Sequence, residues 1–241
     1  MKKYVTILLW CALMMTSATA FAQDHKVVNV GNFTSLKVNN NVNVIYRSDA
    51  EKAGTAEFTS TESVAKMFIF NNDGKGWLSI QLSDYNFNTG VPTVTVYSAT
   101  LQEVINQSDS AVVIECLPQT PIFKAKTTNN GTITIHGVNA STTVLKEATG
   151  KGHIYADGVT ENLECKLVGT GQIQALDLEA RTISCGISGS GHIYCHSTGG
   201  ELKIKGIGSG KVHYKGTPSK IKLRKLGSIK ALPYSETTLK Q

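Results

Sequence analysis

Clustered cysteines, long apolar runs and paired acidic residues are missing or sparse in this sequence, and each shortage excludes a class of protein. The 241 residues hold five cysteines, none in a Cys-x-x-Cys pair and none joined to a His-x-His cluster. A metal site is therefore not expected, because a metal ion needs several ligands that converge at short spacing. The sequence likewise predicts a protein without an organic cofactor.

The one extended apolar run lies at the N-terminus. Two lysines precede Val5–Met15, and Ala20-Phe21-Ala22 follows with the small-x-small pattern of a cleavage site. The run is too short for a spanning helix, so we interpret residues 1–22 as a signal peptide removed before Gln23. Cys11 follows a bulky residue, which argues against a lipid anchor. We expect an exported protein without a transmembrane segment, located in the periplasm, on the outer-membrane surface or outside the cell.

Positive charge is concentrated late in the chain. Two of the 24 basic residues lie in the signal peptide, which leaves 22 against 18 acidic residues, a net charge of +4. A basic end on an exported protein could contact anionic polysaccharide or lipid headgroups, although solvated strand faces explain the same residues. Nucleic acid is not expected as a partner, because it lies in another compartment. The basic residues concerned are Lys203, Lys205, Lys211, Lys215, Lys220, Lys222, Arg224 and Lys225.

A Gly-x-Gly unit recurs about every 20 residues through the second half of the chain. The second glycine, with its degenerate copies, steps through positions 131, 152, 171, 191, 210 and 227, at intervals of 21, 19, 20, 19 and 17. A period of this size is typical of a solenoid, whose coils must stack on one another to bury a core. The four regular pairs, all expected to be turn glycines, are Gly150/Gly152, Gly169/Gly171, Gly189/Gly191 and Gly208/Gly210.

The residues around each glycine pair indicate a coil of two strands joined by tight corners. Apolar residues alternate after the pair, as in Ile154 and Ala156, and again before it, as in Leu163, Cys165 and Leu167. Period-2 alternation predicts one buried face per strand. Glycine suits the repeated corner because it accepts positive φ. The next residues in the four copies break the Gly-x-Gly-x-x-Gly spacing of a nucleotide loop, which we therefore exclude.

Cys165 and Cys185 occupy equivalent inward positions on adjacent coils. Neighbouring strands lie about 4.8 Å apart, so a disulfide is conceivable on distance, but the two side chains point in the same direction. We favour free, buried thiols.

The region before the repeat is also predicted to be β. Short strands are expected around Val27–Val30, Leu36–Val38 and Val42–Tyr46, and residues 71–76 form a strong hairpin signal between two further strands. This region either begins the solenoid with irregular coils or caps its open end. The sequence thus predicts an all-β protein, a right-handed parallel β-helix or solenoid. Its single domain covers residues 23–234, with an irregular part over 23–105, repeat coils over 106–234 and a polar tail over 235–241.

Several of these motifs together resemble a known family, the "putative auto-transporter adhesin, head GIN domain" proteins, found mostly in Bacteroidetes. They are Phe33-x-x-Leu36-x-Val38 at the start, Ile187-Ser188-Gly189-Ser190-Gly191 in the core, and Tyr214-x-Gly216-x-Pro218 at the end. The resemblance implies a right-handed β-helical fold and a place in the cell envelope. It implies no catalytic residues.

The best candidate site is a surface. Two adjacent outward columns are expected to carry aromatic and hydrogen-bonding side chains that could stack on sugars, although β-strands favour such residues in any case. We therefore prefer a non-catalytic protein that binds a glycan or an envelope or surface protein. The paired positions are His153/Tyr155, Gln172/Gln174, His192/Tyr194 and Lys211/His213.

Two alternatives stay open. A pectinase-like, polysaccharide-active enzyme would need paired carboxylates on one outer face, and Asp157 and Asp177 fall near equivalent corners, where they also serve as turn residues. A purely structural role would follow if an uncapped coil edge paired with a second copy, which would make the protein a homo-oligomer.

Overall fold

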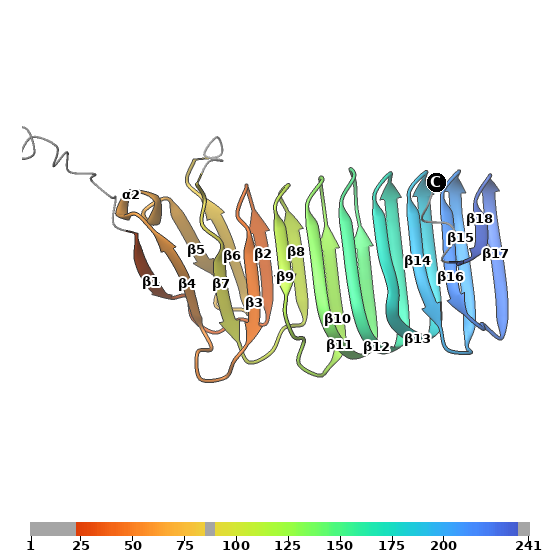
Figure 1. Cartoon of the computed structure of the whole chain (residues 1–241), viewed down its shortest axis with the longest axis horizontal. Coiled ribbons are helices and arrows are strands. Elements are labelled where there is room, and N and C mark those ends of the chain that lie inside the picture. The colour runs from red at the N-terminus through yellow and green to blue at the C-terminus, as the bar shows by residue number, and fades with distance from the viewer. Residues whose placement is uncertain (1–22, 85–89, 236–241) are drawn as a thin grey trace, which may run out of the picture.

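The structure is a computed structural model that describes residues 23–84 and 90–235. Figure 1 shows its strands side by side in one long stack, which forms a β-solenoid of about seven turns with coils about 20 residues apart. The expected signal peptide, residues 1–22, and most of the polar tail lie outside the described residues. The elements are β1 (Asp24–Asn29), β2 (Ser35–Asn39), β3 (Val44–Ser48), β4 (Thr55–Ser60), α2 (Glu62–Ala65), β5 (Phe68–Asn72), β6 (Trp77–Leu82), β7 (Val94–Ser98), β8 (Glu103–Gln107), β9 (Ala111–Ile114), β10 (Thr120–Thr127), β11 (Thr132–Glu147), β12 (His153–Gly169), β13 (Gln172–Gly189), β14 (His192–Ser197), β15 (Glu201–Gly208), β16 (Lys211–Gly216), β17 (Lys220–Gly227) and β18 (Lys230–Pro233).

The predicted solenoid is confirmed, and the repeat sets its register. Each coil pairs in parallel with the next, so that Ile154, Ile173 and Ile193 stack on one another and are fully buried. Full burial of one such side chain contributes about 1.5–3 kcal/mol, and a continuous ladder of them forms the core. The alternation read from the sequence therefore does separate buried from outward positions.

The two glycines of each pair have different physical roles, and the prediction that both are turn glycines is wrong for the second. The first glycine has positive φ, between 100° and 128° in the four regular copies, as the predicted tight corner requires. In the four regular copies the second glycine lacks positive φ, and its backbone is buried between coils; these glycines are Gly152, Gly171, Gly191 and Gly210. Gly227, which the repeat count places among the second glycines, is instead the register partner of Gly208 and has a φ of 98°, so it is a first glycine.

The second glycine is required because successive coils approach one another closely. A Cβ on Gly191 would lie 2.4 Å from the carbonyl oxygen of Gly171 and 2.6 Å from a methyl group of Leu167. A Cβ on Gly210 would lie 2.3 Å from the Cδ1 methyl of Ile187 and 2.8 Å from the carbonyl oxygen of Gly191. Any side chain at these positions would therefore collide both with the neighbouring backbone and with the core.

The corner on the other side of each coil differs from the prediction. We expected turn residues such as Asp157-Gly158 to separate two strands, but β11, β12 and β13 each run on through this corner. The register shifts there, for example between Tyr155 and Asp157, as at a β-bulge. A bulge bends a strand without ending it, and Gly158 supports the bend with a φ of 116°.

The cysteines of the core are free, as predicted. Cys165 and Cys185 are register partners, and both are buried. A hydrogen bond with Cys165, together with complete burial, raises the pKa of the Cys185 thiol well above its ordinary value. These thiols therefore act as small apolar groups in the core.

One inward column at the Gly-x-Gly corner begins with polar residues. Asn106 donates a hydrogen bond to the Ser110 carbonyl, and Thr127 donates one to the Gly131 carbonyl. The next residue of this column is Glu147, which is fully buried and has no hydrogen-bond partner for either side-chain oxygen among the described residues. Burial raises the pKa of the Glu147 carboxyl to about 7.

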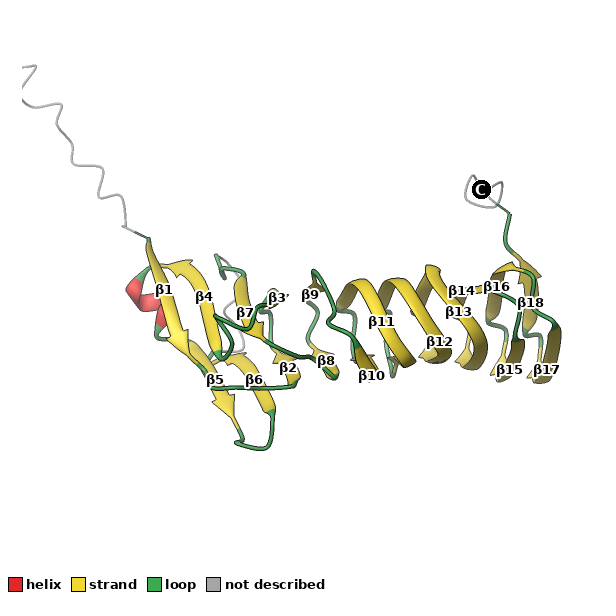
Figure 2. Ribbon diagram, turned by 90° about the horizontal axis from the view of Figure 1, so that it is seen from below, coloured by secondary structure: helices red, strands yellow, loops and turns green. Residues whose placement is uncertain are grey.

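The N-terminal region both contributes coils and caps the stack. The predicted hairpin is confirmed as the antiparallel pair β5–β6, and β1, β4 and β7 pair in antiparallel fashion at the same end. Figure 2 shows β1, β4, β5 and α2 gathered at this end. Their mixed pairing covers the first coil edge, which would otherwise be open to another chain.

The first three coils do not follow chain order. Strand β2 pairs in parallel with β6 on one side and with β8 on the other, and β3 lies likewise between β7 and β9. Figure 1 shows the orange pair β2 and β3 between the yellow β6 and β7 and the yellow-green β8 and β9. The coil formed by β6 and β7 is thus outermost, although the chain forms the coil of β2 and β3 first.

The opposite end of the solenoid is formed by β17 and β18, and every residue of β17 is exposed. Strand β17 carries Lys220, Lys222, Arg224 and Lys225 along its length. Lysine-rich edges repel a second copy of the same edge. Within residues 23–84 and 90–235, no helix is long and apolar enough to cross a membrane.

Candidate functional site

The two outward columns predicted from the sequence exist in the structure. They lie on the strand segments that follow each Gly-x-Gly corner, which we call the histidine–tyrosine face. His153, Gln172, His192 and Lys211 are successive register partners, and so are Tyr155, Gln174, Tyr194 and His213. Because the coils are in parallel register, side chains of the same column stand about 4.8 Å apart.

The aromatic rings of this face are stacked in parallel. The ring centroids of Tyr194 and His213 lie 4.6 Å apart with an interplanar angle of 10°, and those of His192 and His213 lie 5.6 Å apart. The two histidines also approach through Nδ1 of His192 and Nε2 of His213, at 3.3 Å. His153 and Tyr155 form a looser parallel pair at 6.2 Å.

The expectation that His213 is presented to solvent is wrong, because this residue is only 6% exposed. The chain beyond β18 returns over this part of the face. The backbone amide of Tyr234 donates to the Tyr214 carbonyl, and the Tyr234 ring meets the Tyr194 ring edge-on. Burial lowers the pKa of His213, so its neutral form is favoured. The C-terminal end of the histidine–tyrosine face is therefore largely occupied by the protein itself.

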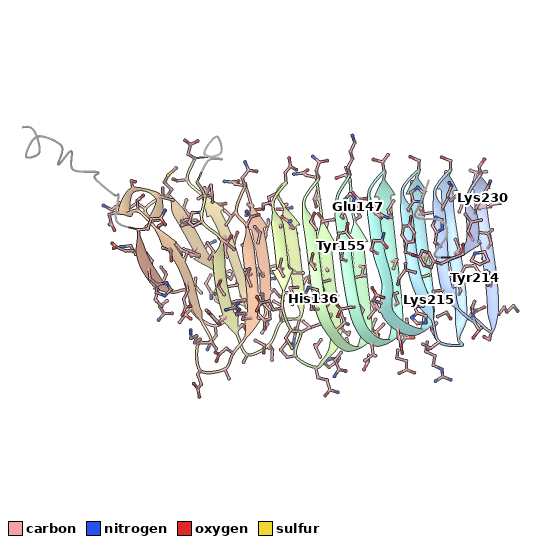
Figure 3. The ribbon with its side chains drawn as sticks, in the orientation of Figure 1. His136, Glu147, Tyr155, Tyr214, Lys215 and Lys230 are labelled. Atoms are coloured by element: carbon pink, nitrogen blue, oxygen red, sulfur yellow. The ribbon has the colours of Figure 1, made fainter. Side chains whose placement is uncertain are left out.

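The other end of the face is open around Tyr155, which is 41% exposed to solvent. Beside it lies a shallow cavity of about 330 Å³, lined in part by His136, Asp157, Gln174 and Asp177. Figure 3 shows His136 and Tyr155 on neighbouring coils of the middle of the stack. An aromatic ring thus stands next to a concave surface with several polar groups.

His136 was not among the residues singled out from the sequence. Its Nδ1 lies 2.7 Å from a carboxylate oxygen of Asp157, and the other carboxylate oxygen accepts a hydrogen bond from the Gly137 amide at 2.7 Å. A signal for it existed, because His136 lies five residues after Gly131 just as Asp157 lies five residues after Gly152. The irregular Asn-Asn-Gly copy of the repeat concealed this equivalence.

The two acidic residues weighed for catalysis are register partners at neighbouring corners. Asp157 is held by His136 and Gly137, so its carboxylate already has a structural use in joining two coils. Within the described residues, no cluster of three or more His, Cys, Asp or Glu side chains could hold a metal ion.

Fold and site together define a parallel β-solenoid with one open, aromatic and polar patch on a rigid outer face. The chain belongs to the family described as "putative auto-transporter adhesin, head GIN domain", whose model matches residues 32–218. The resemblance seen in the sequence motifs is thereby confirmed.

Solved structures show the same fold. A putative adhesin from Bacteroides fragilis NCTC 9343 has a TM-score of 0.78 at 18% identity and covers 88% of this chain and 97% of its own. A putative adhesin from Parabacteroides merdae ATCC 43184 has a TM-score of 0.65 at 18% identity and covers 89% of this chain and 97% of its own. A protein from Parabacteroides distasonis ATCC 8503, described as a putative lipid binding protein, has a TM-score of 0.67 at 19% identity and covers 89% of this chain and 97% of its own. No curated protein matches the chain.

Proposed function

We propose that this protein is a non-catalytic, exported surface protein that binds a glycan in the cavity beside Tyr155. The observation that carries the proposal is the position of the exposed Tyr155 ring at a cavity of about 330 Å³ lined by an imidazole, two carboxylates and an amide. Aromatic rings pack on the apolar faces of sugars, while carboxylates and amides hydrogen-bond hydroxyl groups. Small-ligand sites combine such features in a concave surface.

The scaffold supports binding because it is rigid. Tyr155 and Gln174 are outward residues of β12 and β13, whose backbones are paired on both sides. Residues on paired strands lose little conformational freedom when a ligand arrives, which favours affinity. The family's description as adhesins agrees with a binding role at a surface.

We prefer binding without catalysis because one of the two carboxylates at the cavity is already hydrogen-bonded within the protein. A glycoside hydrolase needs two carboxyl groups free to act on opposite sides of the scissile bond. Asp157 is hydrogen-bonded to His136 and to the Gly137 amide, and Asp177 is the carboxylate of the cavity that has no hydrogen-bond or ion-pair partner within residues 23–84 and 90–235. Self-assembly through the C-terminal edge is disfavoured by the basic residues of β17.

The test is a glycan-array measurement on residues 23–241, a segment that contains every described strand. We expect binding to fall about tenfold or more in Tyr155→Ala, which corresponds to about 1.4 kcal/mol, and to be retained largely in Tyr155→Phe. Val159→Ala is the matched control, because Val159 is a similarly exposed residue of β12 that does not line the cavity.

Two outcomes would contradict the proposal. Unchanged binding in Tyr155→Ala would place the ligand elsewhere on the protein. Shortening of a bound polysaccharide, lost in Asp157→Asn or Asp177→Asn, would make the protein a polysaccharide-active enzyme.

A further inference from the structure

A column of positive charge runs along the strand segments that precede each Gly-x-Gly corner, which we call the lysine face. Register partners on β10, β11, β12, β13, β15 and β17 form one outward column. At about 4.8 Å per coil, it extends for about 24 Å. Its members in order are Lys126, Lys146, Lys166, Gly186, Lys205 and Arg224.

Aliphatic side chains stand in the neighbouring column, two residues further along each strand. Val168, Ile207 and Leu226 are 42%, 58% and 68% exposed, and Ser188 is their register partner on the intervening coil. Aliphatic side chains thus occupy three of these four successive positions, and exposed apolar residues gathered in this way mark an interaction site. The lysine face is thus apolar along one line and cationic along the next.

The positive charge of this face is only partly neutralised. Glu164 pairs with Lys166 at 2.7 Å, and Glu201 pairs with Lys203 and Lys222. Among the described residues, no carboxylate forms an ion pair with Lys146, Lys205 or Arg224. Surface ion pairs in water add little stability, so the excess charge remains available to an anionic partner.

Gly186 leaves a hollow in the middle of the column. The hollow has a volume of about 500 Å³, with Lys146, Lys166 and Lys205 along its sides and Val168 and Ile207 at its apolar wall. Unlike the corner glycines, Gly186 is not required by the fold. It lacks positive φ, and a Cβ there would meet nothing closer than 3.8 Å. A strand interior ordinarily disfavours glycine, and neither backbone conformation nor packing requires it here, so the effect of Gly186 is to keep the hollow open.

We propose that the lysine face docks onto an anionic lipid bilayer, with a lipid phosphate in the hollow at Gly186 between Lys166 and Lys205. The aliphatic tips of Val168, Ile207 and Leu226 enter the boundary between headgroups and acyl chains, while the basic side chains reach the phosphates. A bilayer fits better than a soluble polyanion, because a polyanion would use the cations and leave the aliphatic column exposed. This surface is separate from the Tyr155 cavity and from the function proposed for it.

The test is co-sedimentation of residues 23–241 with vesicles. One set contains phosphatidylcholine alone, and the other contains equal parts of phosphatidylcholine and phosphatidylglycerol. We expect binding to the anionic vesicles only. The double variant Lys205→Gln/Arg224→Gln should lower the partition coefficient about 30-fold, because each basic side chain near an anionic surface contributes about 1 kcal/mol.

The matched control is Lys215→Gln/Lys230→Gln, which removes the same charge from the other side of the Gly-x-Gly corner, where Figure 3 labels both residues. It should leave vesicle binding nearly unchanged. Ile207→Ser should lower binding severalfold. Gly186→Gln fills the hollow without removing a charge, so it should lower binding to the anionic vesicles severalfold while the melting temperature stays at or above that of the wild type, which separates loss of the site from loss of the fold.

Three results would overturn the proposal. Equal binding to both kinds of vesicle would remove the need for anionic lipid. Equal loss in the two double variants would show that overall charge, and not this face, drives binding. Full binding by Ile207→Ser, together with displacement from vesicles by soluble dextran sulfate, would identify the partner as a soluble polyanion.

Discussion

Replacing Gly191 and replacing Gly186 by alanine are the same chemical change a few residues apart, and we expect them to shift stability in opposite directions. At Gly191 the new methyl group would lie 2.4 Å from the Gly171 carbonyl oxygen. That oxygen already accepts a hydrogen bond from the His192 amide at 3.2 Å, so it cannot move without loosening the pairing of two coils. At Gly186 the nearest atoms are a methylene of Lys166 at 3.8 Å and a carbonyl oxygen at 3.9 Å, which are ordinary contacts.

The magnitudes follow from these contacts. Overpacking of this kind costs about 1–3 kcal/mol, whereas alanine at an unstrained glycine position stabilises by about 0.4–1 kcal/mol. For a chain of this size each kcal/mol shifts the melting temperature by about 2–4 °C. Gly191→Ala should therefore melt about 2–12 °C below the wild type, and Gly186→Ala should melt about 1–4 °C above it.

The assay is unfolding by heat and by urea, followed by circular dichroism. Because repeat proteins can unfold in parts, the urea slopes of the variants should be compared as well as the midpoints. If Gly191→Ala were as stable as Gly186→Ala, close approach of the coils would not be the reason for the second glycine, and the account of the repeat given above would be refuted.

Two further predictions concern pH. The raised pKa of Glu147, about 7 against an ordinary 4.5, means that the folded chain keeps a proton which the unfolded chain releases. The free energy of unfolding should therefore fall by on the order of 3 kcal/mol as pH rises from about 4.5 to 7. In Glu147→Gln the urea midpoint should depend much less on pH over this range. An unchanged pH dependence in the variant would show that another group is responsible. Burial lowers the pKa of His192 and His213 below the ordinary 6.5, so here the unfolded chain takes up protons first and stability should fall as pH drops below that value. Protonation of the two histidines should also release the segment around Tyr234, which would be seen as faster hydrogen exchange of the Tyr234 amide after correction for intrinsic rates. If protection of this amide did not depend on pH, histidine protonation and the packing of this segment would not be coupled.

The parts of the fold that repeat were predictable from the sequence, because each coil shows the same spacing of glycine and apolar residues. The stacked isoleucines such as Ile154 and Ile173, and the register partners Cys165 and Cys185, followed directly from the period. Asp157 and Tyr155 were placed on the correct corner and column for the same reason.

The parts that depend on a contact between distant segments were not predictable. His213 has the pattern of an outward residue, and its burial follows from the return of Tyr234, which no period encodes. The period located Gly210 but not its role, because the close approach of Ile187 and Gly191 depends on how the coils pack.

Irregular spacing concealed two other features. Glu147 was missed because its corner is one residue longer than the next, which displaces it from the position that Leu167 holds before Gly171. The order of the first coils depends on strand pairing across stretches without a repeat.

The placement of the coil formed by β2 and β3 between two later ones has a mechanical consequence. A solenoid ordinarily frays from its ends, one coil at a time, because each coil contacts only its neighbours. Force applied at the C-terminus would peel β17 and β18 away in this manner. Force applied at the N-terminus first separates β1 from β4. It then meets the coil of β2 and β3, which lies between the strands of residues 77–98 and those of 103–114, so this coil cannot leave until it separates from both neighbours. The N-terminal end therefore acts as a lock, and resistance to pulling should be unequal at the two ends of the molecule.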